Sequence, residues 1–301
     1  MAAPIAIFAF NRPAHIARML NSAKKNPSFS NRPIQIYCDG PKYKEQEYLI
    51  EETRQAVREH APPHAEIIER EENLGLARSI ISGVTELCAE HGQAIVLEDD
   101  LVLSPFALDF LQRGLDRYAQ EDKVMHISAY MFPAPWRPPS APFFYREATC
   151  WGWATWKRAW DHFESDAGRL LEEIDHRGLR PEFDIRNSMY FYTMLQKQRD
   201  GEIDSWAIRW YASMFLRRGL SLHPPQSFVE NLGFDGTGVH CNTDDHFNVA
   251  VATAPVDAMP DQVVESEAAI QAMIAYRQPS SVRRRVKGLL ARWPWVSKHV
   301  L

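Results

Sequence analysis

Ala94-Ile95-Val96-Leu97-Glu98-Asp99-Asp100-Leu101-Val102 is the stretch that decides the fold. Its first four residues are apolar and mostly branched, which is typical of a strand buried on both faces of a sheet. The three carboxylates that follow would repel one another in a partly dry site unless a positive group lies against them. A divalent cation would supply that charge, and oxygen-only ligands favour Mg²⁺ or Mn²⁺. The alternative interpretation is a solvated acidic turn.

Strand-like and helix-like segments alternate on both sides of this stretch. Strands are expected at 4–10, 34–38, 66–69, 94–97 and 124–128, with helices between them at 15–25, 45–60, 73–90 and 106–118. This alternation predicts an α/β fold with a mostly parallel sheet flanked by helices. From about residue 131 helical spacing dominates, which predicts a more helical second part. We therefore divide the chain into 1–130, 131–245 and 246–301.

Composition restricts the class of protein. The chain has 301 residues, 45% hydrophobic and 24% charged, with a net charge of −5, so no overall basic charge favours binding to nucleic acid. Its four cysteines are far apart and show no Cys-x-x-Cys spacing, which indicates reduced thiols. No apolar run has the length of a membrane span, and no signal peptide is recognised. These features predict a cytoplasmic protein.

Polar residues follow several of the expected strands. Asn11 and Arg12 follow the first strand and Asp39 follows the second, while Asn73 and Arg78 stand at the start of a helix. Ligands of parallel α/β sheets bind outside the carboxyl ends of the strands, and free N–H groups at a helix start favour anions. The pattern predicts a phosphorylated ligand at this edge of the sheet, although each residue taken singly is also typical of an ordinary cap.

These residues resemble the GT-A class of nucleotide-sugar-dependent glycosyltransferases. The likeness is closer to the N-acetylglucosaminyltransferase that starts complex N-glycan branching and to bacterial family-2-like glycosyltransferases. It covers residues 4 to 240 and rests on five segments: Pro4 to Arg12, Asp39-Gly40, Val96 to Ser104, His126 to Tyr130, and Gly152-Trp153. The resemblance implies a GT-A (Rossmann-like) fold, with the nucleotide-sugar bound by 1–130 and the acceptor by 131–245.

The resemblance also implies roles for the acidic residues. Asp100 would bind Mn²⁺ or Mg²⁺ directly, and Glu98 and Asp99 would hold the ribose or metal-bound water. His240, in the glycine-rich segment 231–240, would be a further metal ligand or a phosphate contact; the alternative is a surface histidine in an ordinary loop. The nucleotide would be contacted by residues at the strand ends and the helix start: Phe10, Asn11, Arg12, Asp39, Asn73 and Arg78.

Inversion at the sugar carbon also needs a general base that accepts the proton of the acceptor hydroxyl. We expect Asp204, in Ile203-Asp204-Ser205-Trp206, because the resembling family has an Asp-Asp-Trp segment there. Only the first carboxylate of that pair is present in this chain. A helix N-cap is an equal alternative for Asp204, and Glu164 and Asp166 are the other candidates for the base.

Four tryptophans lie within the segment 151–160. Trp151, Gly152 and Trp153 are expected to contact the acceptor, since aromatic faces stack on sugar rings. Trp153, Trp156 and Trp160 also have the spacing of one helical stripe. We therefore expect Trp156 and Trp160 to lie in the core.

Taken together, the sequence predicts a metal-dependent, inverting hexosyl- or N-acetylhexosaminyltransferase. It would move a sugar from a UDP-sugar to a glycan or a lipid-linked saccharide in bacterial surface polysaccharide biosynthesis. One alternative is a sugar nucleotidyltransferase, which would carry a glycine-rich loop after the first strand. The other is a non-catalytic sugar-nucleotide-binding protein on the same fold.

The last segment of the chain, Val282 to Leu301, is basic and amphipathic. Such segments lie in the membrane interface, and each Lys or Arg near an anionic surface contributes about 1 kcal/mol. The sequence therefore predicts peripheral contact with the inner face of the cytoplasmic membrane. The alternative is a tail that frays or packs on the body of the protein.

Overall fold

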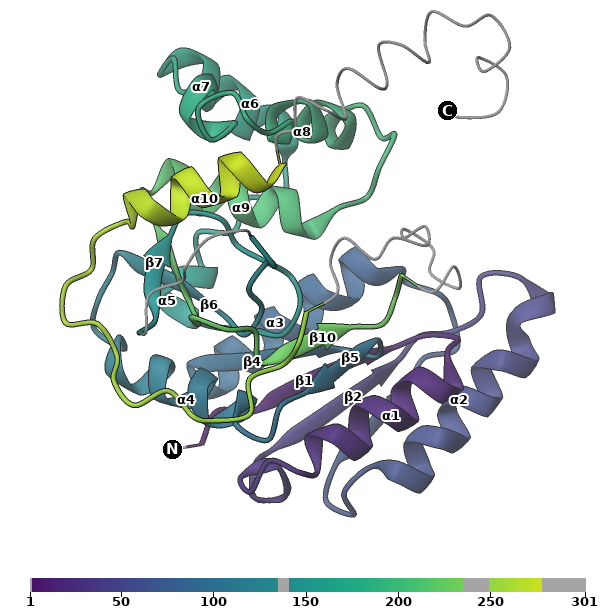
Figure 1. Cartoon of the computed structure of the whole chain (residues 1–301). Helices are drawn as coiled ribbons and strands as arrows, with labels where there is room; N and C mark the ends of the chain where they lie inside the picture. Colours follow the sequence, from purple (N-terminus) through teal and green to yellow (C-terminus); the bar gives the residue numbers. More distant parts are fainter. Residues whose placement is uncertain (1, 135–140, 235–248, 278–301) are drawn as a thin grey trace, which may run out of the picture.

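The computed structural model of the chain describes residues 2–134, 141–234 and 249–277 (Figure 1). Its main sheet is built from β1 (Ile5–Ala9), β2 (Ile34–Cys38), β3 (Glu66–Glu69), β4 (Gln93–Glu98), β6 (Val124–Ser128), β7 (Phe143–Tyr145), β8 (Trp153–Trp156) and β9 (Leu220–His223). They lie in the order β3-β2-β1-β4-β8-β6-β9-β7. Only β8 and β7 run against the other strands of this sheet. The predicted α/β class and mostly parallel sheet are confirmed.

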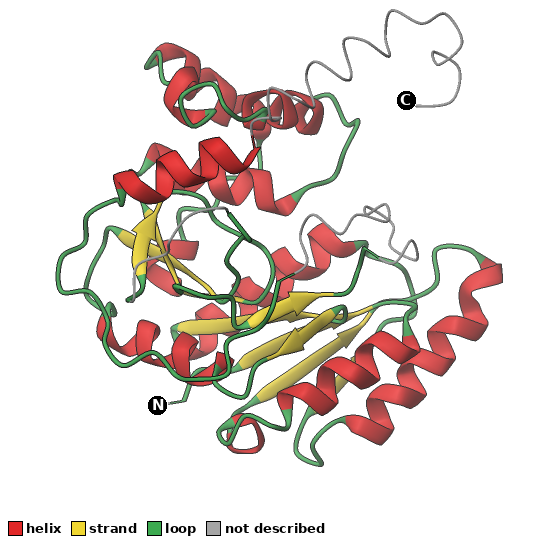
Figure 2. Ribbon diagram, in the orientation of Figure 1, coloured by secondary structure: helices red, strands yellow, loops and turns green. Residues whose placement is uncertain are grey.

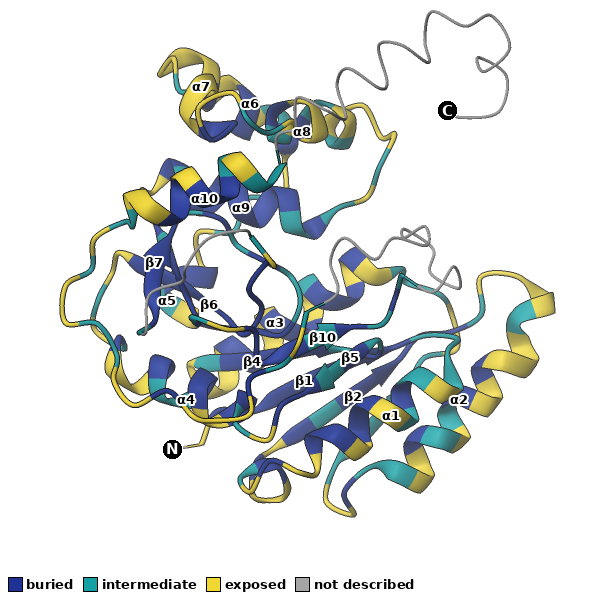
Figure 3. Cartoon of the chain, in the orientation of Figure 1, coloured by how far each residue is buried: buried dark blue, intermediate teal, exposed yellow. Residues whose placement is uncertain are grey.

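Helices cover both faces of this sheet (Figure 2). α1 (Pro13–Ala23) and α2 (Glu47–His60) lie together on one face, and α3 (Leu76–His91) lies on the other. The remaining helical elements are η1 (Phe29–Asn31), η2 (Lys44–Gln46), α4 (Ala107–Arg117), α5 (Lys157–Trp160), α6 (Ala167–His176), α7 (Arg180–Phe183), α8 (Phe191–Arg199), α9 (Trp206–Leu216) and α10 (Glu267–Arg277). Figure 3 shows that α6, α7 and α8 keep their outer faces exposed.

Strands β1 and β4 are the centre of the core. The side chains of Ile5, Ile7, Ile95, Val96 and Leu97 are completely buried. Burying each of them stabilises the fold by about 1.5–3 kcal/mol relative to exposure. Covering on both faces explains why the sequence shows a continuous apolar run in place of an alternating pattern. The last residue of β4 is Glu98, so this packing fixes where the acidic residues emerge.

The main core extends across the sequence boundary expected at residue 130. Its members run from Ala3 to Met273, and β7, β8 and β9 belong to the same sheet as the earlier strands. A second, smaller core lies within 167–216, where α6, α7, α8 and α9 pack together. The more helical second part is therefore present, joined to the first part through a shared sheet. The assignment of nucleotide and acceptor binding to the two parts stays a prediction.

The tryptophan segment differs from the helical stripe predicted for it. Trp153 to Trp156 forms strand β8, and only the following four residues form the short helix α5. Residues three apart on a strand face opposite sides of the sheet. Accordingly the Trp156 Nε1–H donates to the backbone oxygen of Leu115 on α4, while Trp153 stacks on Trp206 of α9. Burial of Trp156 and Trp160 in the core is confirmed.

Several parts of the fold are missing from the sequence-based prediction, among them β7. β5 (Leu101–Leu103) pairs antiparallel with β10 (Val229–Asn231) in a separate two-stranded sheet. Helix α10 follows a stretch without clear periodicity and is drawn in yellow in Figure 1. The basic tail and His240 lie outside the described residues, so the expected membrane contact stays a prediction. None of the helices in the described ranges is long and apolar enough to cross a membrane.

A buried ion pair fastens the end of α10 to the segment that follows β7. The Arg277 guanidinium donates to both carboxylate oxygens of Glu147 at 2.7 and 2.8 Å, and these side chains are only 14% and 9% exposed. Arg277→Met would leave the Glu147 carboxylate buried without its partner. We expect a loss of about 3–5 kcal/mol in the free energy of unfolding, measured by urea denaturation.

Arg186→Met is the matched control, because Arg186 makes a similar two-bond pair with Glu267 on the same helix at an exposed position. Exposed ion pairs contribute little to stability, so the control should change the unfolding midpoint far less. Adding Glu147→Gln to Arg277→Met should recover part of the loss. Equal effects of the two single substitutions would contradict the role of burial.

Candidate functional site

The ends of β2, β1 and β4 meet at one edge of the sheet. Phe8 on β1 is in register with Glu98 on β4, and Ala9 is in register with Cys38 on β2. The backbone N–H of Phe10 donates to Asp99 Oδ2 at 3.2 Å. The parallel register thus brings Phe10 to Arg12, Asp39 and the acidic residues to the same edge.

Arg12 is the cation that faces the acidic residues. It precedes α1, and Pro13 stands at the first position of that helix, where its fixed φ suits the helix start. The Arg12 guanidinium donates to Asp100 Oδ2 at 3.1 Å, and both side chains are 14% exposed. This charge favours the ionised form of each of the three carboxylates. His15 acts in the same sense on Asp100.

One arginine does not offset the cost of burying three carboxylates. Burial, followed by the charge of the Asp100 carboxylate, raises the pKa of Asp99 to about 7. Burial, followed by the charges of Asp100 and Asp99, raises the pKa of Glu98 well above its usual range. Burial also raises the pKa of Asp100, against the opposing effect of Arg12. The site therefore favours an additional positive charge.

The segment after β10 closes the site over Asp100. Asn231 is in register with Leu101, and the Leu232 N–H donates to the backbone oxygen of Asp100 at 2.8 Å. Gly233 is so close that a Cβ at this position would overlap Asp100 Oδ2 and crowd Asn231 Oδ1. The sequence analysis singled out only His240 in the glycine-rich segment 231–240 and assigned no role to Asn231 or Gly233. The sequence signal that could have identified these two residues is the triplet Asn231-Leu232-Gly233.

One oxygen of Asp100 is left without a partner. Asp100 Oδ1 is buried and accepts no hydrogen bond from the described residues. The same residues contain no cluster of three His, Cys, Asp or Glu side chains around a common point. Mg²⁺ is commonly held by one or two carboxylates together with substrate phosphates and water. An unpartnered Asp100 oxygen fits such a site, with Asp100 as its protein ligand.

Asp39 has the opposite character, because both of its oxygens are occupied. Oδ1 accepts from the Leu74 N–H at 2.9 Å, and Oδ2 accepts from the Gly75 N–H at 2.9 Å and from Asn73 Nδ2 at 3.1 Å. Gly40 permits this approach, since a Cβ there would overlap the backbone of residues 71 and 72. Asp39 and Asn73 thus fix the loop before α3.

Arg78 lies in the first turn of α3 and is exposed. Within the described parts of the chain its guanidinium forms no ion pair, so it is available to an anion at this helix start. Asn11, between Phe10 and Arg12, is partly buried at the same edge. The predicted nucleotide contacts are thus gathered around the ends of β1 and β2 and the start of α3.

Aromatic rings extend from the acidic residues toward α10. The Trp151 ring lies 4.4 Å from Tyr130 and 5.5 Å from Phe234, and the Phe132 ring lies 6.1 Å from Tyr276, between ring centroids. Trp151 is partly buried, and Gly152 adopts a φ of 67° that suits glycine. Sequence reasoning did not identify Phe132 or Tyr276, because they are distant from Trp151 along the chain.

Trp153 occupies a different environment from Trp151. It is completely buried, and its ring stacks on Trp206 at 5.0 Å and on His126 at 5.1 Å. In this structure neither face of the Trp153 ring is open to a sugar. The side chain instead joins β8 to α9 and so positions the segment that contains Asp204.

Asp204 lies just before α9 and is 61% exposed. Its carboxylate accepts a hydrogen bond from the Arg209 guanidinium at 2.9 Å. The helix cap is Ser205, whose hydroxyl accepts from the Ile208 N–H, so the predicted alternative of a cap at Asp204 is wrong. Asp166 does cap a helix, since its carboxylate accepts from the first N–H groups of α6. Glu164 accepts from the Asp166 N–H and supports that turn.

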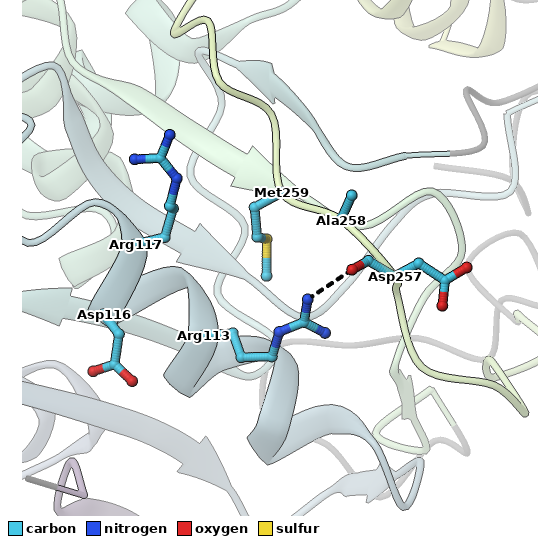
Figure 4. Close-up of a pocket in the computed structure, with 6 residues that line it drawn as sticks. All are labelled: Arg113, Asp116, Arg117, Asp257, Ala258 and Met259. Carbon is cyan, nitrogen blue, oxygen red and sulfur yellow. Dashed lines mark hydrogen bonds between the residues drawn. The ribbon is translucent and has the colours of Figure 1, made fainter.

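A surface depression of about 470 Å³ lies away from these residues, between α4 and residues 257–259. Figure 4 shows its lining, in which the Arg113 guanidinium donates to the backbone oxygen of Asp257 at 3.1 Å. The other arginine, Arg117, pairs with Asp261 at 3.0 Å. Both arginines belong to the half of α4 that leads into the start of β6, at the opposite edge of the sheet. Their internal pairing makes this depression a poor candidate for an anion site.

No protein-family model matches the chain, and no curated protein matches it. Among solved structures, the mannosyltransferase PcManGT from Pyrobaculum calidifontis in complex with GDP-Man and Mn²⁺ is 11% identical, with 72% of this chain and 69% of that chain covered and a TM-score of 0.42. A UDP-glucose pyrophosphorylase complexed with UDP-glucose is 10% identical, with 74% and 90% covered and a TM-score of 0.36. S. aureus TarS is 14% identical, with 42% and 21% covered and a TM-score of 0.28.

The raised pKa of Asp99 predicts a pH dependence of stability. The pKa is about 7 in the folded state and 3.8 in the ordinary exposed state, so the folded state binds more protons between these values. The resulting stability is complete below about pH 3.8 and is lost as the pH rises through about 7. Asp99→Asn should therefore raise the thermal midpoint relative to the parent more at pH 8 than at pH 4, measured in EDTA.

Comparison with the parent protein separates this effect from that of His126. Burial, followed by the nearby His223, lowers the pKa of His126 to about 3, which makes the protein less stable as the pH falls below about 6.5. That contribution is present in both proteins and cancels in the difference. Asp161→Asn, at a half-exposed carboxylate on the surface, is the control for the loss of one negative charge. Parallel profiles for Asp99→Asn and the parent would contradict the assignment.

Proposed function

We propose that this chain is a metal-dependent, inverting glycosyltransferase that transfers a sugar from a UDP-sugar to a glycan or lipid-linked saccharide. The observation that carries the proposal is the buried Asp100 Oδ1, which has no hydrogen-bond partner among the described residues and lies just after the carboxyl end of β4. Gly233 lies against the same carboxylate, where a larger residue would not fit. Strand ends of this kind are where α/β sheets bind their ligands. An excess of carboxylates over cations at this edge supports a divalent ion as part of the site.

In this proposal each group at the edge has a separate task. Asp100 holds Mn²⁺ or Mg²⁺, and Glu98 and Asp99 hold the ribose or metal-bound water. Such an ion supplies Lewis acidity that offsets charge on a nucleoside diphosphate leaving group. Asp39 and Asn73 keep the loop before α3 in place, so that the N–H groups at the start of α3 face the donor. Arg78 adds a positive charge there, and Phe10 and Asn11 border the nucleotide.

The acceptor side of the proposal uses Trp151, Gly152 and Asp204. The partly buried Trp151 ring offers an apolar surface to a sugar, next to Phe234 and close to the glycine that approaches Asp100. Asp204 accepts the proton of the acceptor hydroxyl. The hydrogen bond from the Arg209 guanidinium orients this carboxylate.

A sugar nucleotidyltransferase is the second candidate, and the region after β1 distinguishes the two. Pro13 begins α1 directly after Asn11 and Arg12, so no glycine-rich loop follows the strand. Product analysis with a UDP-sugar, Mn²⁺ and a set of saccharide acceptors decides between them. A glycosylated acceptor with UDP as the coproduct supports transfer. Formation of a nucleotide-sugar from a sugar phosphate and a nucleoside triphosphate would replace the proposal.

Asp100→Asn tests the metal site. The substitution removes the charge and keeps the shape, and the strand before it carries the packing, so we expect an unchanged thermal midpoint or a higher one. Mn²⁺-dependent binding of UDP, measured by calorimetry, should be lost. Asp161→Asn serves as the control for loss of one negative charge on the surface. Unchanged Mn²⁺-dependent affinity in Asp100→Asn would refute the assignment of this residue.

Asp204→Asn tests the base. A base acts on the acceptor, so the dissociation constant of the donor should stay unchanged while kcat falls by about 10²–10⁴-fold. Glu164→Gln and Asp166→Asn should have small effects, because both side chains support the turn before α6. A fall of less than about tenfold for Asp204→Asn would place the base elsewhere.

A further inference from the structure

We propose that Arg12 is a built-in counter-ion that occupies Asp100 until the nucleotide binds, and so makes metal binding depend on the nucleotide. The proposal rests on the proposed function above, because it takes Asp100 as the metal ligand. It adds a regulatory role for Arg12 to the nucleotide contact predicted from the sequence. Three observations on the described residues carry it.

The first observation is the contact itself. The Arg12 guanidinium lies 3.1 Å from Asp100 Oδ2, and each side chain is only 14% exposed. Arg12 is the cation that acts on all three carboxylates; His15 acts on Asp100 alone. In the absence of a metal, Arg12 therefore supplies the positive charge that the sequence predicted this site to need.

The second observation is the lack of space at the same oxygen. Gly233 approaches Asp100 Oδ2 so closely that even a Cβ would overlap it, and the Arg12 guanidinium contacts the same oxygen. Asp100 Oδ1 stays buried and without a hydrogen bond within the described chain. A cation bound through Asp100 therefore lies close to the Arg12 guanidinium. The bound cation and the Arg12 guanidinium are both positive, and two positive groups that lie close together in a partly dry site repel each other strongly.

The third observation concerns the anions that could pair with Arg12 in place of the three carboxylates. A divalent metal at Asp100 would offset the charge of all three carboxylates, so a displaced Arg12 would need another anion, because leaving a buried charge unpaired is costly. Asp39 already accepts three hydrogen bonds from the loop before α3 and pairs with Arg70 at 3.9 Å. A nucleoside diphosphate bound at this edge would provide the anion, and guanidinium groups bind phosphates well. The nucleotide thus favours release of Arg12 from Asp100, and release favours the metal.

This linkage predicts positive coupling between metal and nucleotide, and the coupling must be reciprocal. The test measures the dissociation constant of Mn²⁺ from its electron paramagnetic resonance signal, without nucleotide and with saturating UDP. Arg12→Met removes the charge and retains an apolar side chain of similar reach. We expect Mn²⁺ alone to bind about tenfold more tightly to Arg12→Met than to the parent. The further gain on adding UDP should be correspondingly smaller.

Three other variants make the outcomes separable. Arg12→Lys keeps the charge and should behave like the parent, whereas Arg12→Gln is a second neutral variant and should behave like Arg12→Met. Asp100→Asn should lose Mn²⁺ binding with and without UDP. Thermal midpoints in EDTA identify any variant that is not folded, and the folded neutral variant then decides the test.

The outcomes overturn different statements. Suppose that Asp100→Asn loses Mn²⁺ binding, but the folded neutral variant binds Mn²⁺ no more tightly than the parent. The counter-ion role of Arg12 is then refuted, and the metal site stands. The same conclusion follows if Arg12→Lys tightens Mn²⁺ binding as much as Arg12→Met, because charge is then not the cause. If Asp100→Asn binds Mn²⁺ like the parent, the metal site of the proposed function is refuted.

Discussion

Repulsion among Glu98, Asp99 and Asp100 is the constraint on which the functional edge of this protein depends. A strand buried on both faces delivers these carboxylates to one place, where burial raises their pKa values. Arg12 reaches them because β1 and β4 are adjacent and parallel. The same geometry that packs the core therefore creates an excess of negative charge at the edge of the sheet. That excess of negative charge is the physical basis of the proposed divalent-cation site.

Comparison of Asp39 with Asp100 shows how satisfied and unsatisfied carboxylates differ in what they can do. Both follow parallel strands at the same edge. Asp39 accepts three hydrogen bonds that fix the loop before α3, so it organises the backbone around the site. Asp100 has one oxygen paired with Arg12 and one buried without a partner. Only the second arrangement leaves an acceptor for a ligand.

Tertiary contacts also connect the site to remote parts of the chain. Phe234 follows the glycine that approaches Asp100, and its ring meets Trp151. Phe132 lies under the Arg277 guanidinium, 4.4 Å from its centre, and Arg277 is the residue that fastens α10 to Glu147. A chain of contacts thus runs from the carboxylates to the last described helix. Substitutions at α10 are expected to act on the site through these rings.

The sequence by itself determined the elements whose signals are local. The apolar run before Glu98, the strand at Ile34–Cys38 and the helices between strands could be predicted, because each buries a face with its own period. The parallel order then placed Arg12, Asp39 and the acidic residues at one edge. Only the tertiary structure decided what depends on distant partners. Trp153 to Trp156 pairs with β4 and β6 as a strand despite its helical spacing, since pairing with neighbouring strands overrides local propensity. The pairing of Leu101–Leu103 with Val229–Asn231, which brings Gly233 to Asp100, depends on residues more than a hundred positions apart, and no local pattern records it.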